Sequence, residues 1–357
     1  MKIGIYDPYL DDIGGGEKYM LSIAEALSMG NDVSVFWNNK EDFENVKKRF
    51  SLRLSNVRIE KNIFGKNVSF WERYKISREY DVLIVLSDGS IPLVSSRLLI
   101  HLQRPVPHIR LSILSRIKKA RVKTFFCNSY YTKSFIDKSF KINSKVIYPP
   151  ITISARKLKK ENIILHVGRF RIMDKEHEVR DFKKQYMLLQ VFKQLVDQGL
   201  TGWTLYMVVS VRKEDLDIFH EIVQNYKKYP IEFKINKGSY DLWNYYSLAK
   251  IYWHASGYGE DLVKNPEYAE HFGISTVEAM GAGVVPVVIS AGGQKEIVED
   301  GVNGFTWSSE EEFKEKTMNL IKSKNLLDQM SAKAIIRSKD FTYDSFAKKI
   351  IEMVGRK

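Results

Sequence analysis

Two glutamates stand eight positions apart in the stretch Glu270-His-Phe-Gly-Ile-Ser-Thr-Val-Glu278. A Gly-rich turn, Ala279-Met-Gly-Ala-Gly283, and the apolar run from Val284 to Ile289 follow at once, and this order predicts a loop, a helix start and a buried strand. A carboxylate at each end of the short, Gly-containing stretch from Glu270 to Glu278 can accept hydrogen bonds from two sugars of one ligand. Free amides at the helix start suit a phosphate between them. A nucleotide sugar has this layout of groups.

The block resembles the E-x7-E signature of retaining family-4 glycosyltransferases, and the similarity continues through Gly292-Gly-Gln-Lys-Glu-Ile-Val298 and Asp300-Gly-Val-Asn-Gly304. The resemblance implies a GT-B fold, an α/β architecture of two Rossmann-like domains facing a central cleft. It also implies that Glu270 contacts the donor sugar and Glu278 the ribose. The remaining donor contacts implied for this block are His271, Phe272, Gly273 and Ile274. The alternative is a solvated helix face that carries two acids.

Three glycines, Gly14-Gly-Gly16, stand eight residues after the first predicted strand. Glycines let the backbone approach a ligand closely and leave amides pointing toward it. The run resembles the GG-x-E loop of the same family, which implies donor contacts for Gly15 and Gly16. A dinucleotide-binding fingerprint would need G-x-G-x-x-G directly after the strand, so an NAD enzyme is disfavoured. A flexible turn remains the alternative.

His101 ends an apolar strand in Ile100-His-Leu-Gln-Arg-Pro105, where open α/β sheets place ligand-contacting groups. The string resembles the H-x-x-P segment of relatives that build lipid-linked mannose chains, lengthened by one residue. This likeness implies a catalytic-site role for His101, as a hydrogen-bond partner of a donor sugar hydroxyl. A structural histidine at the strand end is the alternative.

Two groups of cations follow in the second half of the chain. Arg169 comes directly after a predicted strand, and Lys183-Lys184-Gln185 opens the next predicted helix. A fixed guanidinium and a mobile ammonium can offset the charge that collects on a nucleoside diphosphate as the sugar departs. The resemblance places Arg169 and one of the two lysines on the diphosphate, with Lys183 favoured and Lys184 left open. The charged segment from Arg171 to Asp181 makes the gap longer than is usual in the family.

No metal and no cofactor are expected. Asp215-Leu-Asp217 imitates the D-x-D of metal-dependent transferases, but it stands at a predicted helix start, where acids favour the helix dipole. No Cys and His cluster has zinc spacing. The resemblance implies transfer with retention, and because both glutamates are committed to binding, a front-face route is preferred to a double displacement.

Short β-rich runs alternate with helical patterns along the 357 residues, which predicts parallel sheets covered on both faces. The consecutive prolines of Tyr148-Pro-Pro-Ile151 interrupt this alternation and mark a linker. We expect an acceptor-side domain over 1–150, a nucleotide-sugar-binding domain over 151–340, and a last helix over 341–357 that packs back toward the first domain. The helical spacing of Phe346, Ile350 and Val354 supports that helix.

The first half of the chain is strongly basic, with 25 Lys and Arg against 15 Asp and Glu over residues 1–150. Such asymmetry suggests an anionic partner. The segment from Arg110 to Lys123 places Leu111, Leu114 and Ile117 near one helical face among basic residues, which suits an anionic membrane surface. A helix packed on its own sheet is the alternative.

The setting expected from the sequence is cytoplasmic, with the protein soluble or peripheral on the cytoplasmic face of a membrane. The single Cys127 cannot form an internal disulfide, no signal peptide is evident, and the apolar runs are too short to span a bilayer. No nucleic acid is expected as a partner, because no known binding module appears.

The function expected is a retaining hexosyltransferase that uses a nucleoside-diphosphate sugar and a glycan or lipid-linked acceptor. GDP-mannose ranks ahead of UDP-sugars, because the Glu270 block and the Tyr148 segment most resemble mannosyltransferases. The alternatives are a UDP-sugar-dependent transferase with a soluble acceptor, and a non-enzymatic protein that binds nucleotide sugars or nucleic acid.

Overall fold

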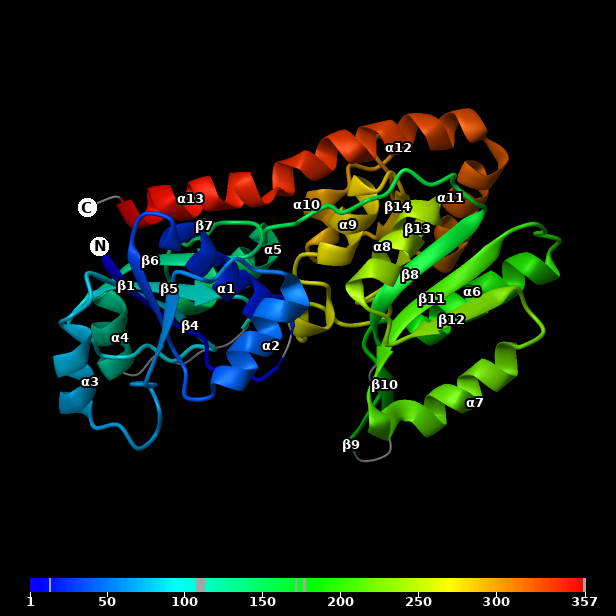
Figure 1. Cartoon of the computed structure of the whole chain (residues 1–357). Helices are drawn as coiled ribbons and strands as arrows, with labels where there is room; N and C mark the ends of the chain where they lie inside the picture. Colours follow the sequence, from blue (N-terminus) through cyan, green and yellow to red (C-terminus); the bar gives the residue numbers. More distant parts are fainter. Residues whose placement is uncertain (13, 107–112, 171, 176–177, 356–357) are drawn as a thin grey trace. The chain divides into compact units, whose positions relative to one another are not determined.

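A computed structural model describes residues 1–12, 14–106, 113–170, 172–175 and 178–355 (Figure 1). Arg110, Leu111 and Arg171, which entered the expectations above, lie outside the described residues. The chain divides into two compact units, and each is described by itself. Unit 1 comprises Met1–Pro150 and Tyr343–Lys357, and unit 2 comprises Ile151–Thr342.

Unit 1 contains a parallel sheet in the order β3-β2-β1-β4-β5-β6-β7. Apolar side chains point to both faces, as in β4, where Ile84 joins one core cluster and Val85 the other. A sheet buried on both faces accounts for strands that read as continuous apolar runs. The strands are β1 Lys2–Tyr6, β2 Asp32–Phe36, β3 Val57–Glu60, β4 Val82–Leu86, β5 Arg97–Leu102, β6 Val122–Cys127 and β7 Lys145–Val146.

The helices of unit 1 supply the two cores. Side chains of α1, α2 and α13 pack in one cluster, and side chains of α3 and α5 pack in the other. The last helix belongs to the first cluster through four buried residues, Phe346, Ile350, Met353 and Val354. The helices are α1 Gly15–Ser28, α2 Lys40–Phe50, α3 Phe70–Ser77, α4 Ile113–Ala120, α5 Tyr130–Phe140 and α13 Tyr343–Gly355.

Unit 2 repeats the design with a parallel sheet in the order β12-β11-β8-β13-β14-β15. Its core is rich in large aromatic rings; Phe313 stacks on Trp307 with ring centroids 4.5 Å apart and also packs against Trp253. The strands are β8 Ile163–Phe170, β11 Thr204–Val211, β12 Ile231–Ile235, β13 Ile251–His254, β14 Val285–Ile289 and β15 Phe305–Trp307.

The helices of unit 2 follow the strands in turn, and an antiparallel hairpin of β9 Ile172–Lys175 and β10 Glu178–Asp181 leads into the first of them. The α-helices are α6 Gln185–Asp197, α7 Leu216–Tyr226, α8 Ser239–Leu248, α9 Ile274–Gly281, α10 Gln294–Ile297, α11 Glu310–Lys322 and α12 Lys324–Ser338. Single 3-10 turns occupy Lys213–Asp215, Pro266–Tyr268 and Lys339–Phe341.

The expectation of two parallel-sheet, Rossmann-like units is confirmed. The sequence reasoning missed β3, β15 and the β9–β10 hairpin, because these strands are only three or four residues long and lack a clear apolar run. Within the described part of the chain, no helix combines the length and apolar character needed to cross a bilayer.

In each sheet a fully buried histidine hydrogen-bonds to the neighbouring strand. Nδ1 of His101 on β5 lies 3.3 Å from the carbonyl oxygen of Phe126, and Nδ1 of His166 on β8 lies 3.0 Å from that of Trp253. The His101 ring also stacks on Tyr19 with centroids 4.2 Å apart. Burial lowers the pKa of both rings, and the backbone hydrogen bonds offset this effect only in part, so the pKa of each ring is about 3. Both rings are therefore neutral at neutral pH.

We predict that the His101→Phe variant loses part of the acid sensitivity of the fold. Between pH 6.5 and 3 the unfolded histidine binds a proton that the folded one does not, so stability falls as pH decreases through that window. From pH 7.5 to 5.5 the wild type should lose about 1.4 kcal/mol more than the variant. Urea unfolding at the two pH values measures this difference. The same substitution at the exposed His220 is the control, and equal pH dependence of wild type and His101→Phe would contradict the prediction.

Candidate functional site

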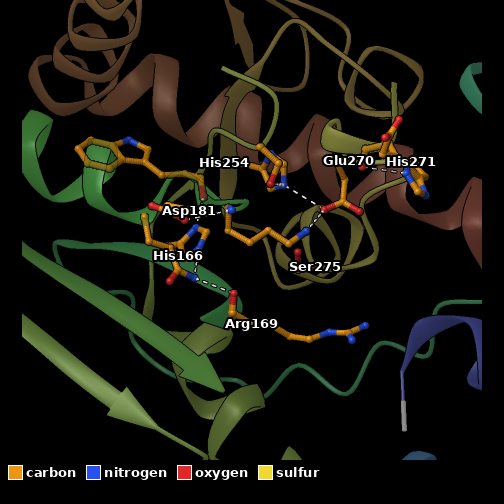
Figure 2. A network of polar contacts seen from close by, with 12 residues as sticks. His166, Arg169, Asp181, His254, Glu270, His271 and Ser275 are labelled. Carbon is orange, nitrogen blue, oxygen red and sulfur yellow. Dashed lines mark hydrogen bonds and ion pairs between the residues drawn. The ribbon is translucent and has the colours of Figure 1, made fainter. Parts of the chain in front are cut away.

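The main polar cluster of unit 2 centres on the Glu270 carboxylate, in the loop before α9 (Figure 2). Its Oε2 accepts a hydrogen bond from Lys183 Nζ at 2.6 Å and another from His254 Nε2 at 3.2 Å. Lys183 comes from the loop before α6, and His254 is the last residue of β13. Three segments that are distant in sequence therefore meet on one carboxylate.

The electrostatics of this cluster keep Glu270 ionised. Burial alone would raise the pKa of Glu270, but the Lys183 ammonium and the His254 hydrogen bond outweigh burial and hold the pKa well below its usual range. Burial lowers the pKa of His254 despite the neighbouring carboxylate, so the ring is neutral and its Nε2–H donates to Glu270. The buried Nδ1 of His254 has no hydrogen-bond partner among the described residues.

The loop before α6 separates the two candidate lysines. Lys184 has a left-handed backbone with φ of 54°, and its Nζ lies 2.5 Å from Glu260 Oε1 rather than on Glu270. Asp181 fixes this turn, because its two oxygens accept hydrogen bonds from the backbone amides of Lys183 and Tyr186. The structure thus brings Lys183 to Glu270 and directs Lys184 elsewhere. The extra residues that lengthen this region form the β9–β10 hairpin.

Arg169 lies at the carboxyl end of β8 and is exposed. Its backbone oxygen accepts a hydrogen bond from Gln185 Nε2 at 3.4 Å, and the same amide nitrogen lies 3.1 Å from Nε2 of His166. Figure 2 shows the Arg169 side chain extending away from His166. The His166–Gln185 contact therefore joins the end of β8 to the start of α6, and sequence reasoning missed both residues because only the fold brings them together.

The amino end of α9 carries the expected amide groups. Gly273 caps the helix with φ of 120°, and a side chain there would collide with the Gln294 amide 2.7 Å away. Gly292 and Gly293 pass very close to the loop before α9. A Cβ added to Gly292 would lie 2.3 Å from the backbone oxygen of Glu270, and one added to Gly293 would lie 2.5 Å from the backbone oxygen of His271. This close backbone contact fixes the loop that presents Glu270, His271, Phe272, Gly273 and Ile274.

Glu278 lies about one turn further along α9, beyond the amino end that Gly273 caps. Its Oε2 accepts a hydrogen bond from the hydroxyl of Tyr246 on α8 at 3.0 Å. Nearer the start of α9, Ser275 Oγ lies 2.7 Å from the hydroxyl of Tyr252 on β13. The helix therefore presents one carboxylate along its length and another in the loop before it.

Unit 1 holds the other candidate residues. Gly15 and Gly16 open α1, and a Cβ on Gly16 would lie 2.4 Å from the Gln103 side chain, so the loops after β1 and β5 meet at this glycine. His101 is fully buried, and its Nε2 has no hydrogen-bond partner among the described residues. The sequence reasoning overlooked Asp7, which directly follows β1. Burial raises the pKa of Asp7 to about 7.

Among the described residues the charged cluster forms no metal-binding group, and a cavity of unit 2 lies next to it. Within the described residues, no group of three or more His, Cys, Asp or Glu side chains could hold a metal ion. A cavity of about 390 Å³ lies beside α6 and α7; its lining includes Asp181 and Gln185 but none of Lys183, Glu270 or Glu278. The arrangement of charges, rather than this cavity, therefore locates the site.

Comparison with known sequences identifies the family to which unit 2 is similar. The family model "Glycosyl transferases group 1" matches residues 151–337. The GDP-Man:Man(3)GlcNAc(2)-PP-Dol alpha-1,2-mannosyltransferase of Dictyostelium discoideum is 28% identical over 231 residues, which cover 61% of this chain and 43% of that protein. The protein of the same name from Homo sapiens is 29% identical over 237 residues, covering 58% and 44%. The chain thus spans less than half the length of these curated relatives.

Comparison with solved structures bears on the fold alone. Anabaena Alr3699/HepE in complex with UDP aligns over 99% of both chains with a TM-score of 0.71 and 19% identity. A glycosyltransferase from Rickettsia africae ESF-5 aligns over 99% of this chain and 97% of its own, with a TM-score of 0.74 and 14% identity. These matches confirm the expected GT-B fold.

We predict that Lys183→Met destabilises unit 2 by about 1 to 2 kcal/mol at pH 7, because the partly buried Glu270 carboxylate loses its cation. The difference from the wild type should shrink as pH falls, since protonation of Glu270 removes the unpaired charge. Urea unfolding between pH 4 and 7 measures both effects. Lys264→Met, which breaks the exposed pair with Asp261, is the control and should cost less than about 0.5 kcal/mol. Equal losses in the two variants would be evidence against the paired Glu270.

Proposed function

This chain belongs to the glycosyl transferases group 1 family, and on that premise we propose that it transfers a hexose, mannose before others, from a nucleoside-diphosphate sugar to a glycan or lipid-linked acceptor. The observation that carries the proposal is the ionised Glu270 between Lys183 and His254, followed by Glu278 on α9. The names of the relatives in Dictyostelium discoideum and Homo sapiens give GDP-Man as donor and a PP-Dol glycan as acceptor, which supports mannose and a lipid-linked acceptor.

In this proposal each charged group of unit 2 meets one part of the donor. Glu270 accepts hydrogen bonds from the sugar hydroxyls, and Glu278 accepts them from the ribose. The diphosphate lies between them, against Arg169, Lys183 and the backbone amides from Phe272 to Ile274. Lys183 is the better candidate of the two lysines, because it already lies 2.6 Å from Glu270 whereas Lys184 pairs with Glu260.

The proposed reaction retains the configuration of the sugar by a front-face route. The bond from the anomeric carbon to the diphosphate oxygen breaks, and the acceptor oxygen bonds to that carbon on the same face. The acceptor hydroxyl gives its proton to the departing diphosphate oxygen. The proposal assigns both glutamates to binding the donor, so no carboxylate is left in it to act as a nucleophile. The cations lower the barrier by offsetting the charge on the leaving diphosphate.

His101 has the weakest structural support among the proposed catalytic residues. Only its Nε2 lacks a hydrogen-bond partner among the described residues, so this nitrogen would have to reach the donor sugar. The ring is fully buried and stacked on Tyr19, and this favours the competing role in the core of unit 1.

A UDP-sugar is the second candidate donor, because HepE, which shares the fold over nearly the whole chain, was crystallised with UDP. A protein that only binds nucleotide sugars would keep the same charged cluster. Slow hydrolysis of the donor in the absence of acceptor would distinguish a transferase from such a binding protein.

We predict that one class of nucleoside-diphosphate sugar, GDP-mannose first, stabilises the protein in a thermal-shift screen against GDP, UDP and ADP sugars. A ligand at a hundredfold excess over its Kd adds about 2.7 kcal/mol to the free energy of unfolding.

Glu278→Gln should weaken donor binding about tenfold through the loss of a charged acceptor. Glu270→Ala should lower kcat about a hundredfold, because the sugar loses its anchor at the reacting centre. Unchanged kinetics in both variants would remove the assignment.

A basic stretch of unit 1 supports an anionic membrane as the place where a lipid-linked acceptor is met. Residues 89–136 contain nine Lys and Arg and no Asp or Glu. On α4 the apolar side chains of Leu114 and Ile117 are 54% and 56% exposed, although an internal helix would turn them to its sheet. Apolar side chains surrounded by cations suit the surface of an anionic bilayer.

Helix α3 carries further exposed apolar side chains. Its first residues, Phe70 and Trp71, are 41% and 75% exposed, and tryptophan favours the boundary between water and lipid. Both helices end on one segment, since Ser77 Oγ accepts from the Ser95 amide and the Arg121 guanidinium donates to the Val94 oxygen. We therefore propose that α3 and α4 contact the membrane together.

We predict that the wild type sediments with anionic vesicles at low salt, and that replacing both Leu114 and Ile117 by Ser lowers the bound fraction at least fivefold. The reason is that each exposed side chain would gain about 1 kcal/mol or more in the lipid interface. Cosedimentation with neutral and anionic vesicles measures binding. Met29→Ser, at another exposed apolar residue of unit 1, is the matched control. Absence of wild-type binding to anionic vesicles would exclude this surface as a membrane contact.

A further inference from the structure

We propose that Tyr246 and Lys160 are positioning residues that hold the Glu278 carboxylate ready for the ribose of the donor. This inference rests on the proposed function, which assigns the ribose to Glu278. Neither residue belongs to the glutamate motif or to the cation groups found in the sequence. Their contacts with α9 and with each other carry the argument.

Tyr246 is a fully buried tyrosine whose hydroxyl meets Glu278 directly. The side chain lies on α8, packs against Trp243 with ring centroids 5.3 Å apart, and donates to Glu278 Oε2 at 3.0 Å. Burial, and then the Glu278 charge, raise the pKa of Tyr246 well above its ordinary value, so the phenol stays protonated and remains a donor. A ring that is fixed by its packing presents this hydroxyl in one place.

Lys160 joins the two helices that carry the pair. Its Nζ donates to the backbone oxygen of Tyr246 at 3.1 Å and to that of Ala282, the cap of α9, at 2.7 Å. Carbonyl groups at helix ends carry partial negative charge, so one ammonium holds the end of α8 against the end of α9. Glu278 lies four residues before Ala282 on the same helix. Lys160 thereby fixes the backbone on both sides of the Tyr246–Glu278 hydrogen bond.

Burying the Lys160 ammonium costs stability, and its contacts with the two helix ends account for its presence. Burial lowers the pKa of Lys160 to about 8, so keeping the ammonium charged in this place opposes folding relative to an apolar side chain of equal length. Methionine would fill similar space without that penalty. What the ammonium adds is the contact between the two helix ends.

A fixed carboxylate matters for binding a ribose. A glutamate on a helix surface samples several rotamers, and ordering it when a ligand arrives weakens binding. The Tyr246 hydrogen bond orders the Glu278 carboxylate before the ligand arrives. Preorganisation of this kind should appear as affinity for the ribose hydroxyls and not for the pyrophosphate.

The experiment compares Tyr246→Phe with the wild type by calorimetric titration with GDP and UDP and with their 2′,3′-dideoxy analogues. For the nucleotide that the wild type prefers, we expect Tyr246→Phe to bind about five- to tenfold more weakly, the effect of one hydrogen bond to a charged group. Affinity for the dideoxy analogue should stay within twofold, because that ligand lacks the hydroxyls. Tyr245→Phe, which removes the neighbouring hydroxyl on the same helix, is the matched control and should change neither value.

The outcomes separate this inference from the proposed function. Equal weakening for both ligands, or no weakening, in Tyr246→Phe overturns the positioning role while nucleotide binding by the wild type stands. A wild type that binds no nucleotide overturns the function and the inference together. Should Tyr246→Phe fail to fold, Lys160→Met provides the same comparison, and an unchanged preference for the ribose form in that variant overturns the inference.

Discussion

The site depends on one constraint, which is that a carboxylate removed from water must keep a cation or become protonated. Glu270 meets this constraint through Lys183 and His254, which come from different segments of unit 2. The neutral His254 can only donate to the carboxylate, so of these two partners it is the Lys183 ammonium that supplies the compensating charge. The turn at Asp181, the left-handed Lys184 and the end of β13 all serve to bring these two groups to one oxygen.

The sequence was sufficient for the architecture and for the residue types of the site. Val82 to Leu86 is apolar along its length, whereas Ile231 to Ile235 alternates apolar and charged residues, and each forms a strand of a parallel sheet. The sequence was insufficient where the determining contact is distant along the chain. The choice between Lys183 and Lys184 depends on a backbone twist of one residue, and the hydroxyl of Tyr246 meets Glu278 only because α8 packs beside α9. No local pattern of residues records such contacts.

The two sheets share a buried histidine contact, although the sequence analysis named only His101 as a candidate site residue and not His166. In both, a neutral histidine within a strand donates from Nδ1 to a carbonyl of the adjacent strand, at Phe126 in unit 1 and at Trp253 in unit 2. In unit 2 the other ring nitrogen meets Gln185, so the histidine links β8 to α6. In unit 1 the ring of His101 stacks on Tyr19 of α1. Each histidine thus connects its sheet to a covering helix.

Helix α13 completes the core of unit 1, although it follows the whole of unit 2 in the sequence. During synthesis, the strands of unit 1 leave the ribosome long before Phe346 and Ile350 exist to cover them. Unit 2, from Ile151 to Thr342, is continuous and can fold as its own residues emerge. Of the two units, the one whose strands are made earlier is therefore completed later, and the apolar face that α13 covers stays exposed until the residues of that helix emerge.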